Sequence, residues 1–164
     1  MTLSAMISAA RARALDFTTK LAWAPPLVAR VTLGVLFIST GWGKVHDLQK
    51  VTSFFTDLGI PMPHLNAVMV SFVELIGGTL LLIGLASRLA ALPLIASMAV
   101  AILTAQREQV HGLPDLFGLV EWTYLALLLW VAFVGPGKVS LDHLLVRKKR
   151  AVPLQTFPEP LINH

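Results

Sequence analysis

Residues 72–88 read FVELIGGTLLLIGLASR, an almost uninterrupted apolar run that contains one carboxylate, Glu74. A run of about 20 apolar residues can cross the hydrocarbon core of a bilayer as a helix. The run around Glu74 extends over about 67–86, and similar runs lie at about 27–45, 88–106 and 119–136. The sequence therefore predicts an all-α integral membrane protein, a bundle of four transmembrane helices.

The composition agrees with a membrane protein. Of the 164 residues, 55% are hydrophobic and 13% are charged, whereas a soluble domain carries about 25% charged residues. The net charge of +4 needs no nucleic-acid partner, because basic residues that flank membrane spans explain it. The chain has no cysteine, which excludes disulfide relays, cysteine-ligated iron–sulfur clusters and thiolate nucleophiles from this chain.

The polar flanks predict the domain organisation and the topology. Residues 1–25 have apolar residues at helical spacing and are expected to form an amphipathic helix on the cytoplasmic membrane surface; an organelle transit peptide is the alternative. The membrane domain covers 26–145, and 146–164 form a basic, proline-containing tail. Basic residues concentrate near both ends of the chain, which predicts two cytoplasmic termini in the inner membrane and outer loops at 46–66 and 107–118.

The first outer loop is expected to carry a short helix on the outer membrane surface. Asp47 is a suitable N-cap and Gly59 a suitable helix stop. Pro93 is expected near the start of the third span, where a missing N–H costs least.

Spacing within the first two spans predicts a polar pair at a helix contact. Gly41 and Lys44 share one face of the first span, and Glu74 and Gly78 share one face of the second. Glycines allow membrane helices to approach closely. Because an unpaired charge at membrane depth is costly, Glu74 is predicted to be buried, with Lys44 as its partner.

Further polar residues are expected to converge near this pair in the outer half of the bundle. Glu121 begins the fourth span beside Trp122 and Tyr124, and Gln106 ends the third. Three interpretations stay open: a structural clasp between helices, a pocket for a ligand head group, and a proton or ion path. The proton or ion path has weaker support, because the sequence places no further carboxylates in the inner half of the bundle. The histidines His46, His64 and His111 have no ligand-type spacing, so no metal site is predicted.

Five segments in order resemble the DoxX family of four-helix membrane proteins. They cover most of residues 29–145 and read ARVTLGVLFISTGWGKV, FFTDLGIPMP, VELIGGTLLLIGLASRLAALPLIASMAVA, EWTYLALLL and GPGKVSLD. The family is named with a membrane subunit of a thiosulfate:quinone oxidoreductase, so the resemblance implies contact with membrane redox systems. The polar positions that match are Arg30, Lys44, Glu74, Arg88 and Glu121.

We therefore expect an inner-membrane subunit or accessory of a redox system that interacts with the quinone pool. Its partners would be the lipid bilayer and other membrane proteins of a complex. It would have no intrinsic cofactor and would bind a quinone, and any enzymatic role would be that of a quinone-linked oxidoreductase subunit. The alternatives are a non-enzymatic structural subunit and a small transporter or metal-handling protein.

Individual residues receive roles in this hypothesis. Lys44 and Glu74 would bind the quinone oxygens with Glu121 nearby, while Arg30 and Arg88 would be structural charges. The aromatic residues expected to wall the ring are Trp42, Trp122 and Tyr124.

Overall fold

The computed structural model describes residues 3–150, which form helices joined by turns. This part of the chain confirms the all-α prediction. In chain order the elements are α1 (Leu3–Leu21), α2 (Ala24–His46), α3 (Leu48–Asp57), α4 (Pro63–Ile83), α5 (Ser87–Leu103), a 3-10 turn (Arg107–Gln109), α6 (Leu113–Gly118), α7 (Val120–Val134) and α8 (Leu141–Arg150). Most of the expected C-terminal tail, residues 151–164, lies outside the described residues.

Within residues 3–150, two helical stretches are long and apolar enough to cross a bilayer, Arg11–His46 and Pro63–Ile83. The helices α5 and α7 are apolar but have only 17 and 15 residues. At a rise of about 1.5 Å per residue, α7 is about 22 Å long, less than the roughly 30 Å of a typical hydrocarbon core. The chain is thus a helical protein with clear membrane-spanning candidates.

The apolar runs overestimate where the helices end. The quoted run at 72–88 is broken, since α4 ends at Ile83 and Gly84 has φ +73°. This left-handed conformation suits glycine and terminates a helix. The helices α5 and α7, which correspond to the expected third and fourth spans, end at Leu103 and Val134, before the expected residues 106 and 136.

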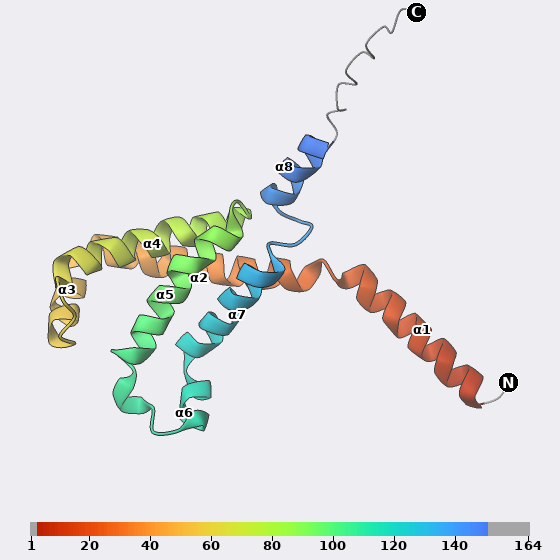
Figure 1. Ribbon diagram of the computed structural model, residues 1–164, viewed down its shortest axis with the longest axis horizontal. Helices are drawn as coiled ribbons and strands as arrows, with labels where there is room; N and C mark the ends of the chain where they lie inside the picture. Colours follow the sequence, from red (N-terminus) through yellow and green to blue (C-terminus); the bar gives the residue numbers. More distant parts are fainter. Residues whose placement is uncertain (1–2, 151–164) are drawn as a thin grey trace, which may run out of the picture.

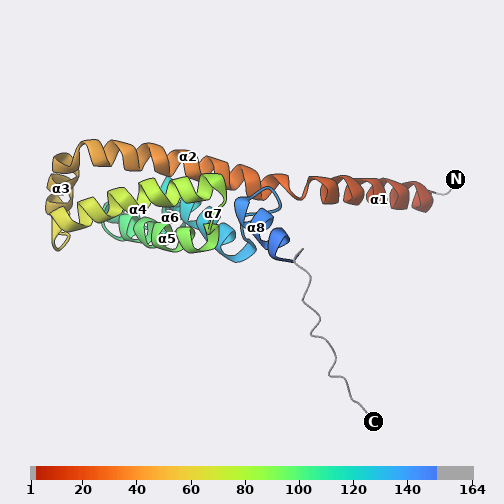
Figure 2. The same cartoon turned by 90° about the horizontal axis from the view of Figure 1, so that it is seen from above.

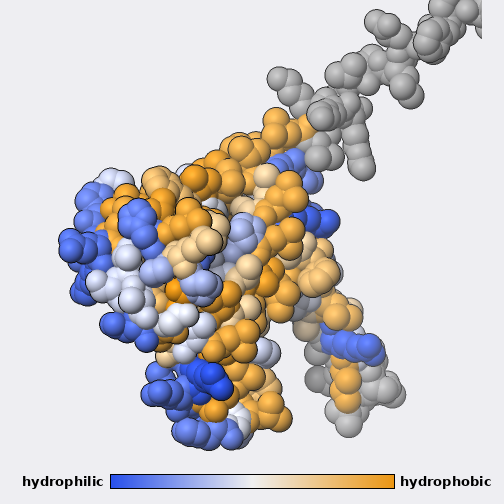
Figure 3. Space-filling view, turned by 60° about the vertical axis from the view of Figure 1, so that its left-hand side comes forward, coloured by the Kyte–Doolittle hydropathy of each residue, from blue (hydrophilic) through white to orange (hydrophobic). Residues whose placement is uncertain are grey.

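The helices form two antiparallel pairs, α2 with α4 and α5 with α7. Figure 1 shows that the pairs approach each other at the end near α8 and diverge toward α3 and α6. The helix α3 lies across the far end of the α2–α4 pair, and α1 extends away from the opposite end (Figure 2). Hydrophilic residues gather over α3 and around the loop with α6, while much of the surface between them is hydrophobic (Figure 3).

Glycines set the close contact between α2 and α4. A Cβ added to Gly41 would lie 2.5 Å from the backbone N of Leu75, and one added to Gly78 would lie 2.7 Å from that of Ile38. Any larger residue would force these backbones apart. The prediction that both glycines lie at a helix–helix contact is confirmed.

The expected surface helix also forms as α3. The Asp47 carboxylate accepts a hydrogen bond from the Lys50 N–H at 3.2 Å, and Gly59 follows the helix with φ +68°. The prediction for Pro93 is wrong, because α5 begins at Ser87 and encloses the proline. Pro93 therefore leaves the Leu89 carbonyl without its intrahelical N–H partner.

The α7–α8 connection and the first turn of α8 close the end where the two pairs meet. The Asp142 carboxylate accepts hydrogen bonds from Ala86 N (2.8 Å) and Ser87 N (3.2 Å) at the start of α5. Arg30, which is buried, donates from Nη2 to the Val139 carbonyl at 2.6 Å. Arg88 donates to the Val134 carbonyl at 3.3 Å. Arg30 thus binds a backbone carbonyl of the connection, and Arg88 binds the last carbonyl of α7.

Candidate functional site

The predicted ion pair between α2 and α4 is present. Lys44 Nζ lies 2.5 Å from Glu74 Oε1. Glu74 is only 2% exposed, whereas the Lys44 side chain is 31% exposed. Gly41 and Gly78, one turn from each charge, permit the approach of the two helices. The pair neutralises a carboxylate that hydrocarbon could not solvate.

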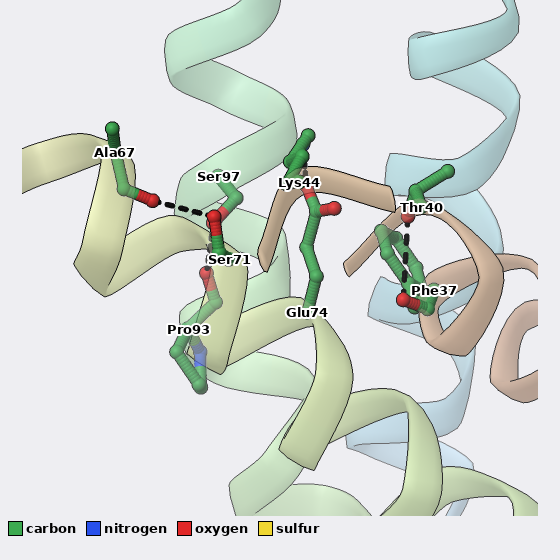
Figure 4. A network of polar contacts seen from close by, with 8 residues as sticks. All are labelled: Phe37, Thr40, Lys44, Ala67, Ser71, Glu74, Pro93 and Ser97. Atoms are coloured by element: carbon green, nitrogen blue, oxygen red, sulfur yellow. Dashed lines mark hydrogen bonds and ion pairs between the residues drawn. The ribbon is translucent and has the colours of Figure 1, made fainter. Parts of the chain in front are cut away.

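The second oxygen of Glu74 is not satisfied. Among the described residues no hydrogen-bond donor reaches Glu74 Oε2, which is inaccessible to solvent. Nearby hydroxyls donate within their own helices, as Figure 4 shows for Ser71, which donates to the Ala67 carbonyl at 2.6 Å, and for Thr40, which donates to the Phe37 carbonyl at 3.3 Å. Ser97 of α5 likewise donates to the Pro93 carbonyl at 3.1 Å. Glu74 Oε2 is therefore a buried acceptor without a hydrogen-bond donor among the described residues.

Lys44 and Glu74 line a cavity of about 710 Å³. This volume lies within the roughly 300–1,000 Å³ typical of small-molecule sites. The walls come mainly from α3, α4 and α5 and are almost wholly apolar; they include Phe54, Phe55, Met69, Val73, Met98 and Ala101. The site combines an apolar cavity with one ion pair whose carboxylate is buried.

The other predicted site residues lie elsewhere. Glu121 accepts a hydrogen bond from Gln106 Nε2 at 2.7 Å, and the Trp122 ring lies 5.3 Å from that of Phe117. Gln106, Glu121 and Trp122 are absent from the lining of the cavity beside Lys44 and Glu74. The convergence of polar groups from all four spans stays a prediction.

The three predicted aromatic walls also lie outside the cavity lining. Trp42 is 59% exposed, and its ring lies 4.4 Å from that of His46. Tyr124 makes an edge contact with Phe37. The aromatic wall consists of Phe54 and Phe55 of α3 instead. Both belong to the short helix that was expected on the outer membrane surface.

No metal centre is evident within residues 3–150, where no three potential ligands among His, Asp and Glu side chains form a suitable group. His46 Nδ1 lies 2.9 Å from the Trp42 carbonyl, a contact within α2.

The sequence of this chain is similar to those of known membrane proteins. The DoxX family model matches residues 26–107. The "Uncharacterized membrane protein Rv3486" of Mycobacterium tuberculosis is 33% identical, over 77% of this chain and 86% of the relative. The "Inner membrane protein YqjF" of Escherichia coli is 30% identical, over 74% and 92%. The "Putative oxidoreductase CatD" of Bacillus subtilis is 29% identical, over 76% and 89%. No solved structure gives a significant match.

Proposed function

Since this chain belongs to the DoxX family of membrane proteins, we propose that it binds a quinone in the cavity beside Lys44 and Glu74. It would do so as a subunit or accessory of an inner-membrane redox system. The observation that carries this proposal is the apolar cavity of about 710 Å³ with the buried ion pair in its lining. One relative's name contains the word oxidoreductase, and another's places it in the inner membrane.

The chemistry of a quinone suits this site. Its ring and tail are apolar and match the walls, and its carbonyl oxygens accept hydrogen bonds. Lys44 has three N–H donors and uses one of them on Glu74. A second can donate to a ring carbonyl without breaking the ion pair. The cavity would thus hold the ring between α3 and α5, with Lys44 at its oxygen.

We further propose that the four apolar helices α2, α4, α5 and α7 cross the membrane with both termini in the cytoplasm. Both α1 and α8 lie at the same end of the molecule (Figure 1), and basic residues concentrate there. Helices as short as α7 can cross by local thinning of the bilayer or with flanking side chains that reach the interface. The cavity would then lie in the outer half of the membrane, because α3 is at the outer end.

A second candidate function is purely structural. The ion pair lies beside Gly41, where α2 and α4 are in close contact. A buried pair in this position can fix the register of two helices. The protein would then be a non-enzymatic subunit of a larger membrane assembly, and the cavity would hold lipid.

Filling the cavity tests the quinone proposal. Ala101→Phe places a ring inside the cavity lining, whereas Leu103→Phe on the same helix changes a residue that is 71% exposed. We expect quinone to be extracted from purified wild type and from Leu103→Phe, and to be lost from Ala101→Phe. Equal quinone in both variants, or none in the wild type, would reject the proposal.

A further inference from the structure

A polar groove lies at the end of the molecule near α8 (Figure 1), apart from the apolar cavity beside Lys44. It has a volume of about 450 Å³ and is open to the surface between the start of α5, the α7–α8 connection and the first turn of α8. Each of these three elements contributes one basic residue to its lining, namely Arg88 from α5, Lys138 from the connection and His143 from α8. The groove therefore brings together basic residues that are far apart in the sequence.

The charges of the groove favour an anion. No ion pair within residues 3–150 involves Arg88, Lys138 or His143. The acidic residue in the lining is Asp142, and both of its carboxylate oxygens already accept hydrogen bonds from backbone N–H groups at the start of α5. With His143 neutral, two cations and one carboxylate give the lining a net charge of +1.

Arg88 is held in place by the end of α7. Its Nη2 donates to the Val134 carbonyl at 3.3 Å. A Cβ added to Gly135 would lie 3.0 Å from both Nε and Nη2 of Arg88, so the guanidinium rests against this glycine. A guanidinium has five N–H donors and suits the paired oxygens of a phosphate. Most donors of this positioned side chain are therefore available to an anion in the groove.

The groove is also bordered by apolar side chains that face outward. Leu89 and Val134 belong to its lining and are 71% and 55% exposed. In a membrane protein such side chains contact the acyl chains of lipids. The sequence of α8 continues with four basic residues at 147–150, which add positive charge on the same helix. Basic pockets between membrane helices on the cytoplasmic side are known to bind anionic lipid head groups.

From this arrangement we infer that the groove binds the phosphate of an anionic phospholipid. Arg88 and Lys138 contact the phosphate oxygens, and Leu89 and Val134 contact the acyl chains. The proposed topology puts this end of the molecule at the cytoplasmic surface, where anionic lipids are common. The inference goes beyond the proposed function and is independent of the quinone cavity, because none of these residues lines that cavity.

The test measures three probes by native mass spectrometry of the full chain in mild detergent: dioleoyl phosphatidylglycerol, dioleoyl phosphatidylcholine and glycerol 1-phosphate. The two lipids share their acyl chains and a phosphate, but only phosphatidylglycerol has a net negative charge. One basic residue near a membrane surface contributes about fivefold in affinity for an anionic lipid. We expect wild type to bind phosphatidylglycerol at least about tenfold more tightly than phosphatidylcholine. Glycerol 1-phosphate at the same concentration should not displace the lipid.

Variants assign the preference to the groove. Arg88→Gln combined with Lys138→Gln should abolish it. Arg11→Gln combined with Arg13→Gln is the matched control, because it removes two charges from exposed positions of α1 outside the groove; it should keep the wild-type ratio. Lys138→Gln alone should lower the ratio about fivefold. It serves if the double variant does not fold, because within residues 3–150 no hydrogen bond involves the Lys138 side chain.

Three results would overturn the inference. The first is equal binding of the two lipids by wild type. The second is a preference that the groove variants keep, or that the α1 control loses equally, because general surface charge would then explain it. The third is displacement of phosphatidylglycerol by glycerol 1-phosphate at equal concentration, which would make the groove a site for a soluble phosphate. None of these results bears on the quinone proposal, which Ala101→Phe tests.

Discussion

Glu74 and Lys44 form an ion pair in which the opposite charges compensate for the cost of placing a carboxylate in an apolar site. The carboxylate is buried and the ammonium is partly exposed. Loss of one partner from a buried pair costs about 3–5 kcal/mol, often more than loss of both. Because Lys44 is 31% exposed, we expect the lower part of this range.

A double-mutant cycle tests this account of the pair. Lys44→Met should destabilise the protein more than Glu74→Gln, because it leaves a charged carboxylate in an apolar site. Lys44→Met combined with Glu74→Gln should recover stability relative to Lys44→Met alone. Thermal unfolding in mild detergent measures all three. If the effects of the single changes simply add, the two residues are not coupled.

The glycines of α2 allow a matched test of helix packing. A Cβ at Gly41 would collide with the backbone of Leu75, whereas one at Gly43 would meet no atom within 4 Å. Gly43→Ala should be neutral or stabilise the protein by up to about 1 kcal/mol, since alanine favours the helix. Gly41→Ala should lower the unfolding temperature clearly. If both variants unfold alike, α2 and α4 do not pack as described.

Among the elements, the first turn of α8 fixes the start of α5. Asp142 accepts from Ala86 N and Ser87 N and so acts as a cap from a distant part of the chain. We expect Asp142→Ala to cost about 0.5–2 kcal/mol, the usual range for a lost N-cap. Asp142→Asn should retain part of this contribution, because its amide oxygen can still accept.

Chemical unfolding of these variants beside Asp16→Ala provides the comparison. Asp16 forms an exposed pair with Lys20 within α1, and such pairs contribute about 0–1 kcal/mol. An Asp142→Ala variant as stable as Asp16→Ala would mean that α8 does not hold the start of α5.

These elements show which features the sequence could predict. The helical fold and the Asp47 cap depend on local sequence and were predictable. The Lys44–Glu74 pair joins two helices, and it was predictable because each helix carries its charge on the same face as a glycine. The cavity depends on the angle at which α5–α7 diverges from α2–α4 and on where α3 lies. No spacing of residues encodes that angle directly, so the aromatic wall was assigned to Trp42, Trp122 and Tyr124 in place of Phe54 and Phe55.

For the whole molecule, the number of spans can be decided by labelling. The natural chain has no cysteine, so single cysteines give no background. With four spans and cytoplasmic termini, an impermeant thiol reagent added outside should label Asp57→Cys and Gln109→Cys but not Gln155→Cys. If only α2 and α4 cross, Gln109→Cys will be protected like Gln155→Cys.

We propose that a quinone occupies the cavity bounded by α3, α4 and α5. Photo-crosslinking with an azido-substituted quinone in native membranes, followed by peptide mass spectrometry, tests this occupancy. We predict crosslinks to the cavity residues on α3 and α5, such as Phe54 and Ala101, and their loss when excess unlabelled quinone is added. Crosslinks confined to exposed residues such as Leu103, or labelling that unlabelled quinone does not reduce, would contradict the claim.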